Sequence, residues 1–306
     1  MKSKKIICIA GPTGAGKSAI AARLGAALGG EVINADSRQA YEDFPIITAQ
    51  PDEAEKALCS HHLYGFLPTD KKMSAGQYAR RAEELIKELL AKDKTPIVVG
   101  GTGLYFRSLL KGIADIPQVG REVRQKWQDR ATLEGPQALH RELAAIDGAY
   151  AAKIHPNDRQ RITRALEVFE STGRTFSWWH QHSPLIGSFD YLYLGVGLPL
   201  PELEPVLARR IDTMLAAGAV EEARAALQKN SDPKAPGWSG IGCAELHRYL
   251  GGRLDLDDAR AIWRRNTRAY AKRQLTWFRA EPEIQWFSPH DYHALREVAQ
   301  AALEIT

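Results

Sequence analysis

The chain has 306 residues, of which 44% are hydrophobic and 25% charged, and its net charge is +4. These fractions are those of an ordinary globular protein, and the net charge alone does not indicate a nucleic-acid partner. Cys8, Cys59 and Cys243 lie far apart, which excludes the ligand spacing of a zinc site and predicts reduced thiols. The apolar runs are too short for a signal-peptide core or a membrane span. We therefore expect a cytoplasmic protein with no membrane partner.

Strands and helices alternate in the first third of the chain. Residues 6–10 are a short β-branched apolar run that ends at glycine, which is typical of a strand buried on both faces of a parallel sheet. Helical spacing of apolar residues follows over 17–28 and again over 75–91, and strand-like runs cover 31–35 and 96–99. This alternation predicts an α/β fold with a parallel sheet.

The character of the sequence changes between about residues 112 and 187. Strand-like runs disappear, and helical segments rich in Arg, Gln, Glu and Ala take over, such as 121–133 and 159–171. Residues 189–198 then return to a strand pattern, a loop-like stretch covers 229–239, and helices extend to Leu227 and over 256–278. We predict an α/β core formed by residues 1–112 and 188–306, including C-terminal helices, with a helical insertion domain at 113–187.

A phosphate-binding loop follows the first predicted strand and opens the first predicted helix. Its sequence fits the pattern GxxxxGK[ST] over Gly11, Pro12, Thr13, Gly14, Ala15, Gly16, Lys17 and Ser18. Glycines let successive backbone N–H groups point at phosphate oxygens, and the helix N-terminus adds partial positive charge. Lys17 supplies a full charge, and the Ser18 hydroxyl is placed to bind Mg²⁺. The motif predicts a phosphorylated ligand but leaves the reaction open.

A carboxylate is expected beside this loop. Asp36, followed by Ser37, Arg38 and Gln39, comes at the carboxyl end of the second predicted strand, where ligands bind in α/β sheets. Such a carboxylate can accept a proton or hold a water bound to Mg²⁺. An N-cap for the next helix explains the same residues equally well.

The last long helix combines cations with aromatic residues. Arg264, Arg265, Arg268, Lys272, Arg273 and Arg279 recur along it, with Trp263, Tyr270, Trp277 and Phe278 between them. This composition is typical of RNA binding, although a solvated helix face with a buried aromatic stripe gives the same pattern.

Five segments in this order resemble the motif series of the tRNA dimethylallyltransferase (tRNA isopentenyltransferase) family: GPTGAGKS, ADSRQAY, GGTGLYFRSLLKG, HPNDRQRITRALEV and TRAYAKRQLTWFR. The resemblance extends from about residue 6 to residue 287 and is to the bacterial type, which lacks a zinc finger. It implies a P-loop NTPase-like parallel sheet core with a helical insertion domain. It also implies transfer of a dimethylallyl group from dimethylallyl diphosphate to N6 of the adenine 3′-adjacent to the anticodon, with release of diphosphate.

The resemblance also assigns roles to individual residues. Asp36 would be the general base, with Thr102 and Lys17 beside it in catalysis. The P-loop residues 11–18 and Arg210 would hold the diphosphate, with Mg²⁺ at Ser18. The tRNA anticodon stem-loop would be bound by the segment 36–39, by Thr102 and Arg124, and by two helical stretches: Arg159, Gln160, Arg161, Ile162 and Thr163, then Lys272, Arg273, Gln274 and Arg279. We expect a monomer.

Two strips depart from the family pattern. Residues 44–51 (FPIITAQP) lack the family's aspartate, glycine and lysine, and Cys243-Ala244 replaces a usual Tyr-Lys or Tyr-Arg pair. Neither strip includes the P-loop, Asp36 or Thr102.

Three other functions use some of the same features. A prenyltransferase acting on free AMP or ADP would share the P-loop and Asp36 but would not need the insertion or the basic C-terminal helix. A small-molecule P-loop kinase would bind ATP tightly. A non-catalytic nucleotide switch or RNA-binding module would leave Asp36 and Thr102 without a task.

Overall fold

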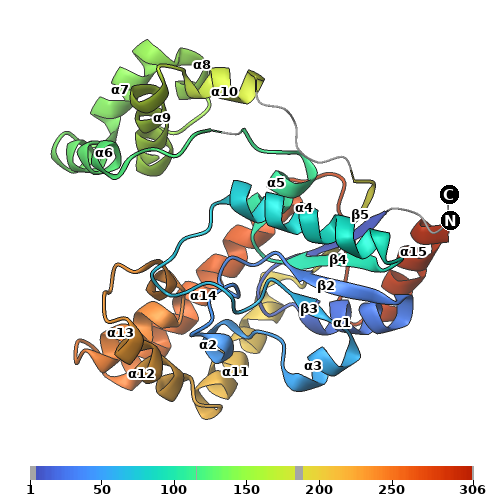
Figure 1. Cartoon of the computed structure of the whole chain (residues 1–306). Coiled ribbons are helices and arrows are strands. Elements are labelled where there is room, and N and C mark those ends of the chain that lie inside the picture. The colour runs from blue at the N-terminus through green and yellow to red at the C-terminus, as the bar shows by residue number, and fades with distance from the viewer. Residues whose placement is uncertain (1–4, 115, 183–188, 305–306) are drawn as a thin grey trace. The chain divides into compact units, whose positions relative to one another are not determined.

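The computed structural model describes residues 5–114, 116–182 and 189–304. The chain divides into two compact units (Figure 1). The first, the core unit, comprises residues 1–110 and 187–306, and the second, the helical unit, comprises residues 111–186.

A six-stranded sheet in the order β3-β2-β4-β1-β5-β6 forms the centre of the core unit. Every neighbouring pair of these strands is parallel. The strands are β1 (Ile6–Ala10), β2 (Gly30–Asn34), β3 (His61–His62), β4 (Thr95–Gly100), β5 (Tyr191–Val196) and β6 (Gln285–Phe287). All five residues of β1 are fully buried. The predicted parallel α/β fold is confirmed.

Helices cover both faces of the sheet. Because side chains alternate along a strand, Ile7 and Ile9 of β1 face α1 (Lys17–Leu28) and α15 (Tyr292–Glu304), and they join Leu24 and Leu295 in one apolar cluster. The opposite face carries α4 (Ala75–Ala91) and α5 (Gly103–Leu110) (Figure 1). There Phe106 of α5 packs against Tyr193, with ring centroids 5.5 Å apart.

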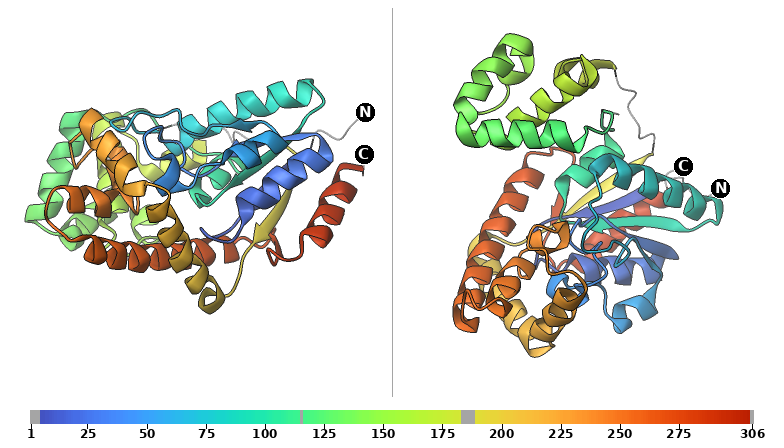
Figure 2. Two further views of the ribbon diagram at one scale, coloured as in Figure 1. Left: turned by 90° about the horizontal axis from the view of Figure 1, so that it is seen from below. Right: turned by 60° about the vertical axis from the view of Figure 1, so that its left-hand side comes forward.

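Most of the remaining helices of the core unit lie beyond the carboxyl ends of strands β1 and β2. They are α2 (Pro45–Thr48), α11 (Leu200–Ala216), α12 (Ala219–Lys229), α13 (Cys243–Leu250) and α14 (Leu256–Arg279), with a short 3₁₀ helix at Pro236–Ser239. Helix α3 (Glu53–Leu58) packs instead against α1. Long α14 packs against α11 and α13 (Figure 2). Ile47, Ile211, Trp238 and Trp263 share a second apolar cluster here.

The helical unit has its own apolar core. It contains α6 (Arg121–Leu133), α7 (Pro136–Ile146), α8 (Gly148–Ala151), α9 (Arg159–Thr172) and α10 (Phe176–His182). Trp127, Leu139, Leu143, Ile162 and Leu166 pack together between these helices. This segment is helical, as its sequence predicts.

The sequence did not predict the two shortest strands. β3 is two residues long and pairs His61 with Val32, and β6 is three residues long and pairs with β5. Strands this short contain no periodic pattern that could reveal them. In the part of the chain that the structure describes, no helix is both long enough and apolar enough to cross a membrane.

Candidate active site

The P-loop backbone adopts conformations that require its glycines. Gly11, Gly14 and Gly16 have φ values of 147°, 78° and 77°, a region that residues with a Cβ atom rarely adopt. A Cβ atom on Gly11 would lie 2.0 Å from the carbonyl oxygen of Val196 at the end of β5. The motif therefore closes tightly around the start of α1, as a phosphate-binding loop must.

Lys17 lies half-buried in this loop. Its Nζ donates a hydrogen bond of 2.7 Å to the carbonyl oxygen of Pro12. Burial lowers the pKa of Lys17 from 10.5 to about 8; the charge of Asp36 opposes this shift and that of Arg210 adds to it. An anion bound in the loop would favour the charged ammonium and raise this pKa.

Asp36 is held in a tight turn at the end of β2. The buried side chain of Asn34 accepts a hydrogen bond from the Asp36 N–H and donates to the Asp36 carbonyl oxygen, at 2.7 and 2.9 Å. The Asp36 carboxylate accepts from the Arg38 N–H at 2.9 Å. The next helix, α2, begins only at Pro45, with Phe44 as its N-cap. The N-cap alternative for Asp36 is therefore wrong.

Thr102 lies beside this turn, where β4 ends. Its N–H donates to the Ala35 carbonyl oxygen at 3.1 Å, and its hydroxyl accepts from the Ser37 N–H at 3.0 Å. Tyr270 of α14 lies next to Thr102, and burial, followed by the charge of Asp36, raises the pKa of its phenol. The structure thus brings Asp36, Ser37 and Thr102 together.

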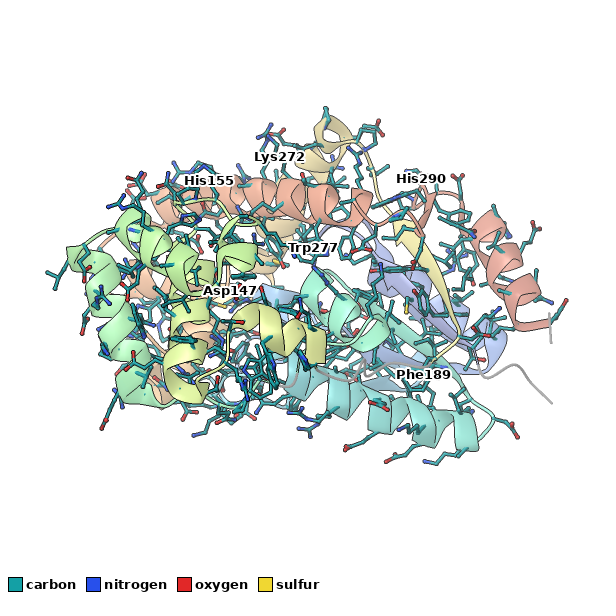
Figure 3. All side chains as sticks on the ribbon, turned by 90° about the horizontal axis from the view of Figure 1, so that it is seen from above. Asp147, His155, Phe189, Lys272, Trp277 and His290 are labelled. Carbon is teal, nitrogen blue, oxygen red and sulfur yellow. The ribbon has the colours of Figure 1, made fainter. Side chains whose placement is uncertain are left out.

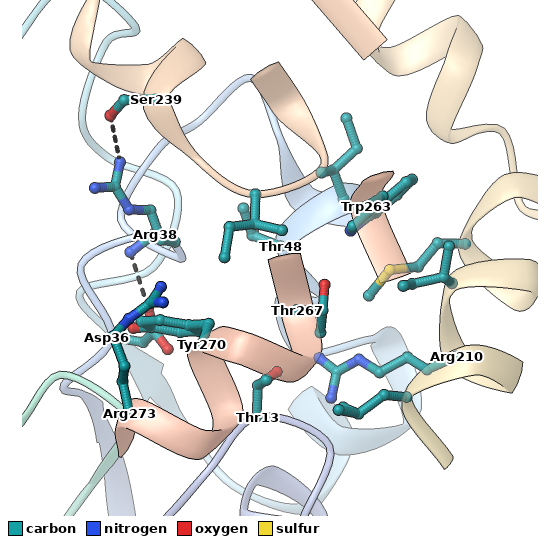
Figure 4. Close-up of a pocket in the computed structure, with 15 residues that line it drawn as sticks. Thr13, Asp36, Arg38, Thr48, Arg210, Ser239, Trp263, Thr267, Tyr270 and Arg273 are labelled. Carbon is teal, nitrogen blue, oxygen red and sulfur yellow. Dashed lines mark hydrogen bonds between the residues drawn. The ribbon is translucent and has the colours of Figure 1, made fainter. Parts of the chain in front are cut away.

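Two adjoining cavities open around these residues. The first, which we name the phosphate cavity, is about 310 Å³ and is lined by the P-loop with Asp52 and Glu55. The second, the mixed cavity, is about 240 Å³. Figure 4 shows Asp36, Tyr270 and Arg273 on one side of it and Arg210 on the other. Both cavities are lined by Thr13, Asp36, Thr48 and Arg210.

One wall of the mixed cavity is apolar. We name it the apolar wall; its residues come from α2, α11, α14 and the loop before α13, and they are Ile47, Leu207, Ile211, Met214, Ile241 and Trp263. Asp36 lies across the cavity from α11, whereas Arg210 is on α11 itself, beside Leu207 and Ile211 of the wall (Figure 4). Burial lowers the pKa of the Arg210 guanidinium, while Asp36 and Glu55 oppose that shift. The mixed cavity suits a ligand that has an apolar part and a charged part.

The two halves of α14 differ in how their charges are paired. In its first half, Arg260 and Arg264 both contact Asp212 of α11 at 2.6 Å; at mid-helix, Arg268 contacts Glu204 at 2.9 Å. Lys272, Arg273 and Arg279 are exposed in its second half, and no described carboxylate pairs with them. Figure 3 shows Lys272 and Trp277 on this half. Among the described residues of α14, these three cations and exposed Arg265 in the first half have no carboxylate partner, so most of the free cations that could meet a polyanion lie in the second half.

The side chains of two glutamines predicted to bind tRNA form hydrogen bonds within the protein instead. The Gln39 amide donates to the carbonyl oxygens of Thr48 and Ala49 at the end of α2. The Gln274 amide joins the P-loop to the turn after β4. Arg38 donates to Ser239 at 2.9 Å and lines the mixed cavity.

The helical unit carries the remaining predicted tRNA contacts. Arg159, Gln160 and Arg161 are exposed at the start of α9, and Asp158 caps that helix. Ile162 and Thr163 are buried, so their side chains hold α9 in its unit. Arg124 donates to the carbonyl oxygen of Val119 at 2.7 Å.

The structure adds residues that sequence reasoning missed. Asn34 shapes the turn of Asp36, and its signal is a polar residue directly after Val32 and Ile33, at the end of the strand. Tyr270 and Trp263, which the sequence indicated only as aromatic residues of a basic helix, line the mixed cavity with apolar residues from segments far apart in the sequence. No local pattern could have identified those residues as neighbours.

The oxygen donors of the phosphate cavity fit a magnesium ion that is bound mainly through the phosphate oxygens of a substrate. Ser18 lines the phosphate cavity, where Asp36, Asp52 and Glu55 supply further hard oxygen atoms. Among the described residues, no cluster of three or more acidic, cysteine or histidine side chains could hold a metal alone. Magnesium commonly binds through one or two protein oxygens together with phosphates and water.

Comparison with known proteins decides the family. The family model described as IPP transferase matches residues 39–281, which is most of the chain. The chain belongs to the IPP transferase family. Its sequence is 56% identical over 290 residues to the tRNA dimethylallyltransferase of Nitratidesulfovibrio vulgaris strain DP4, covering 95% of this chain and 94% of that protein. The Lawsonia intracellularis tRNA dimethylallyltransferase is 43% identical over 300 residues, covering 98% and 99%.

Solved structures of this family share the fold. The crystal structure of the full-length tRNA isopentenylpyrophosphate transferase from Bacillus halodurans has a TM-score of 0.72 at 32% identity, over 99% of this chain and 97% of that one. A eukaryotic dimethylallyltransferase, captured in crystallographic snapshots acting on tRNA, has a TM-score of 0.82 at 30% identity, over 99% and 78%. The family resemblance and the P-loop NTPase-like fold expected from the sequence are confirmed.

Proposed function

We propose that this protein transfers a dimethylallyl group from dimethylallyl diphosphate to N6 of the adenine 3′-adjacent to the anticodon of tRNA, releasing diphosphate. The curated relatives named above are tRNA dimethylallyltransferases, and one structural relative acts on tRNA. The observation that carries the proposal is the pair of adjoining cavities, one lined by the P-loop and one with an apolar wall. The diphosphate of a prenyl diphosphate suits the phosphate cavity, and its prenyl group suits the apolar wall of the mixed cavity.

The chain's own groups supply binding at both ends of the donor. Backbone N–H groups of residues 14–18, Lys17 and Arg210 hold the diphosphate. The apolar wall takes the five-carbon group, whose burial stabilises binding by about 0.8 kcal/mol per CH₂. Asp36 and Arg210 line both cavities and so mark the boundary between them. The bond between the prenyl C1 and the diphosphate oxygen, which breaks in the reaction, then lies at this boundary.

Asp36 acts on the acceptor. The amine nitrogen N6 forms a bond to the prenyl C1, the bond from C1 to the diphosphate oxygen breaks, and the Asp36 carboxylate takes the proton that N6 loses. Thr102 and Asn34 keep the turn of Asp36 in place through their hydrogen bonds. Arg210 and Lys17 offset the charge that develops on the leaving diphosphate.

Magnesium completes the diphosphate site in this proposal. Ser18 would hold the ion together with diphosphate oxygens, in the cavity that Asp36, Asp52 and Glu55 also line. When bound, it offsets negative charge on the leaving group.

The RNA must present an adenine that has left its stack. Extruding a base costs a few kcal/mol, and contacts to the opened loop offset that cost. Lys272, Arg273 and Arg279 of α14 provide unpaired cations for phosphates, and Arg273 lines the mixed cavity. Arg159, Gln160 and Arg161 of the helical unit, with Arg124, are proposed to grip the anticodon arm.

A prenylation assay tests this function. The protein is incubated with Mg²⁺, dimethylallyl diphosphate and an unmodified anticodon stem-loop with a run of adenines, and the digested RNA is analysed by mass spectrometry. We expect prenyladenosine from the RNA and none from AMP. Product from AMP would favour the free-nucleotide prenyltransferase, and ATP turnover without prenylated product would favour a kinase.

The two halves of α14 provide a matched test of RNA binding. Arg273→Ala removes an unpaired cation, so RNA affinity should fall and the slope of log affinity against log salt should decrease by about one. Arg264→Ala removes a cation already paired with Asp212, so it should lower the melting temperature and leave the salt slope unchanged. Equal salt slopes for both variants would contradict the assignment of α14 to RNA.

A further inference from the structure

Gln274 differs from its neighbours on α14. It is only 4% exposed, whereas Lys272 and Arg273 beside it are exposed. A buried amide must find hydrogen-bond partners for both its oxygen and its nitrogen, because unsatisfied buried polar groups are destabilising. The partners of Gln274 therefore show what this position does.

Both partners belong to the active site. The Gln274 Oε1 accepts a hydrogen bond of 2.9 Å from the backbone N–H of Thr13 in the P-loop. Its Nε2 donates one of 2.8 Å to the carbonyl oxygen of Gly101 in the turn after β4. Residues 13, 101 and 274 are distant in sequence, so this single amide joins three separate elements.

The surrounding glycines show how closely α14 approaches this turn. A Cβ atom on Gly101 would lie 2.1 Å from the Gln274 Nε2, and one on Gly103 would lie 2.0 Å from the indole nitrogen of Trp277. On the other side, a Cβ atom on Gly100 would lie 2.2 Å from the Ala35 carbonyl group. The turn that carries Thr102 is thus packed between α14 and the segment that leads to Asp36.

We propose that Gln274 is a positioning residue that holds the P-loop and the Thr102 turn in register, so that the diphosphate and Asp36 meet at the reacting bond; this rests on the proposed function. It acts through the protein rather than by contacting RNA. With its N–H bonded to Gln274, Thr13 fixes the orientation of the P-loop at the point where both cavities meet. The Gly101 bond fixes Thr102, which in turn fixes Ser37 beside Asp36.

The first test replaces the amide by a group of similar shape. Q274M keeps the length of the side chain and removes both hydrogen bonds, and Q300M, at an exposed position of α15, is the matched control. We expect Q274M to weaken binding of Mg²⁺-pyrophosphate about 10-fold, measured by calorimetry, and to lower turnover on the stem-loop about 100-fold. The KM for RNA should change little, because Gln274 does not touch it. Q300M should match the wild type.

A second variant guards against simple misfolding. Q274E keeps an acceptor for the Thr13 N–H, but its ionised carboxylate would repel the Gly101 carbonyl oxygen. Burial and the facing charge of Asp36 raise the pKa of such a carboxyl, and nearby Lys17 opposes that effect. Once protonated, the carboxyl donates and accepts as the amide does. The ratio of wild-type to Q274E pyrophosphate affinity should therefore shrink towards one as the pH falls from 8 to 5.5.

These readouts separate the inference from the function it rests on. Pyrophosphate binding does not require RNA, so it remains informative even if the stem-loop is not prenylated. Wild-type pyrophosphate affinity in Q274M would overturn the proposal, as would a raised KM for RNA with unchanged turnover. A Q274E affinity ratio that does not change with pH would also overturn it.

Discussion

The two cavities of the active site are built in different ways. The phosphate cavity contains the P-loop, whose backbone conformation depends on Gly11, Gly14 and Gly16, and it is completed by residues from 36–55, β4 and α11. The mixed cavity is assembled from residues of α2, α11 and α14 and of three connecting segments: the P-loop, the turn after β2 and the segment before α13. A contiguous backbone cradle recognises phosphate in many proteins, whereas the assembled cavity selects what is attached to the phosphate. The choice of substrate therefore depends on the mixed cavity, whose residues are the harder ones to identify from the sequence.

The largest effect is expected at the boundary of the cavities. Asp36→Asn keeps the shape of the side chain but cannot take the proton, so turnover should fall by about 100- to 10,000-fold. Pyrophosphate affinity should change far less. Single-turnover assays with the stem-loop and calorimetry measure the two quantities, and exposed Asp70→Asn is the control. Retained turnover in Asp36→Asn would exclude Asp36 as the base.

The phosphate cavity should depend strongly on its lysine. Lys17→Met removes the ammonium, and the loss of a charge-assisted hydrogen bond should weaken pyrophosphate binding about 10- to 100-fold. Lys87→Met on α4, where Lys87 pairs with Glu83 at the surface, controls for the loss of a lysine. Equal affinities of the two variants would show that the backbone alone recognises phosphate.

A smaller effect is expected from pH. Burial lowers the pKa of Lys17 to about 8 in the free protein, and only the charged ammonium binds the anion well. Below pH 8 the lysine is charged and affinity stays level. Above pH 8 the lysine loses its proton, so affinity should fall towards 10-fold per pH unit until the pKa of the bound state is reached. Pyrophosphate also titrates in this pH range, so the affinity of the Lys17→Met variant at each pH serves as the baseline. If the affinities of the wild type and of this variant changed with pH in parallel, the role of Lys17 would be refuted.

The smallest effect is expected at the apolar wall. Ile211→Val removes one methylene group, which should raise the KM for dimethylallyl diphosphate about fourfold and leave pyrophosphate affinity unchanged. Ile86→Val, buried in α4 away from both cavities, is the matched control. If Ile211→Val weakened pyrophosphate to the same extent, the mixed cavity would not be the site of the prenyl group.

Local signals in the sequence predicted most of the core sheet. Residues 6–10 are uniformly apolar, and the P-loop glycines follow at once, so β1 and α1 could be placed correctly. Helices α4 and α6 begin and end where their periodicity indicates. By contrast, His61–His62 becomes a strand only because β2 lies beside it.

The sequence predicted those active-site residues that lie within a single short segment of the chain. Asp36 could be placed beside the P-loop, because the carboxyl ends of parallel strands meet at one edge. The double hydrogen bond of Gln274 could not be predicted, since Thr13 and Gly101 approach it only after α14 packs. The apolar wall was hidden for the same reason: Ile47, Ile211 and Trp263 belong to three helices whose packing is not encoded locally.

The position of β1 in the sheet has a consequence for synthesis on the ribosome. β1 pairs with β4 on one side and with β5 on the other, but β5 begins only at Tyr191. At about 5 to 20 residues per second, roughly 10 to 40 seconds pass before that partner emerges. Until then one edge of an entirely apolar strand lacks its neighbour and invites aggregation. Gly11 also lacks the Val196 carbonyl group that it packs against, so the packing of the phosphate-binding loop against β5 is completed only after the helical insertion has been made.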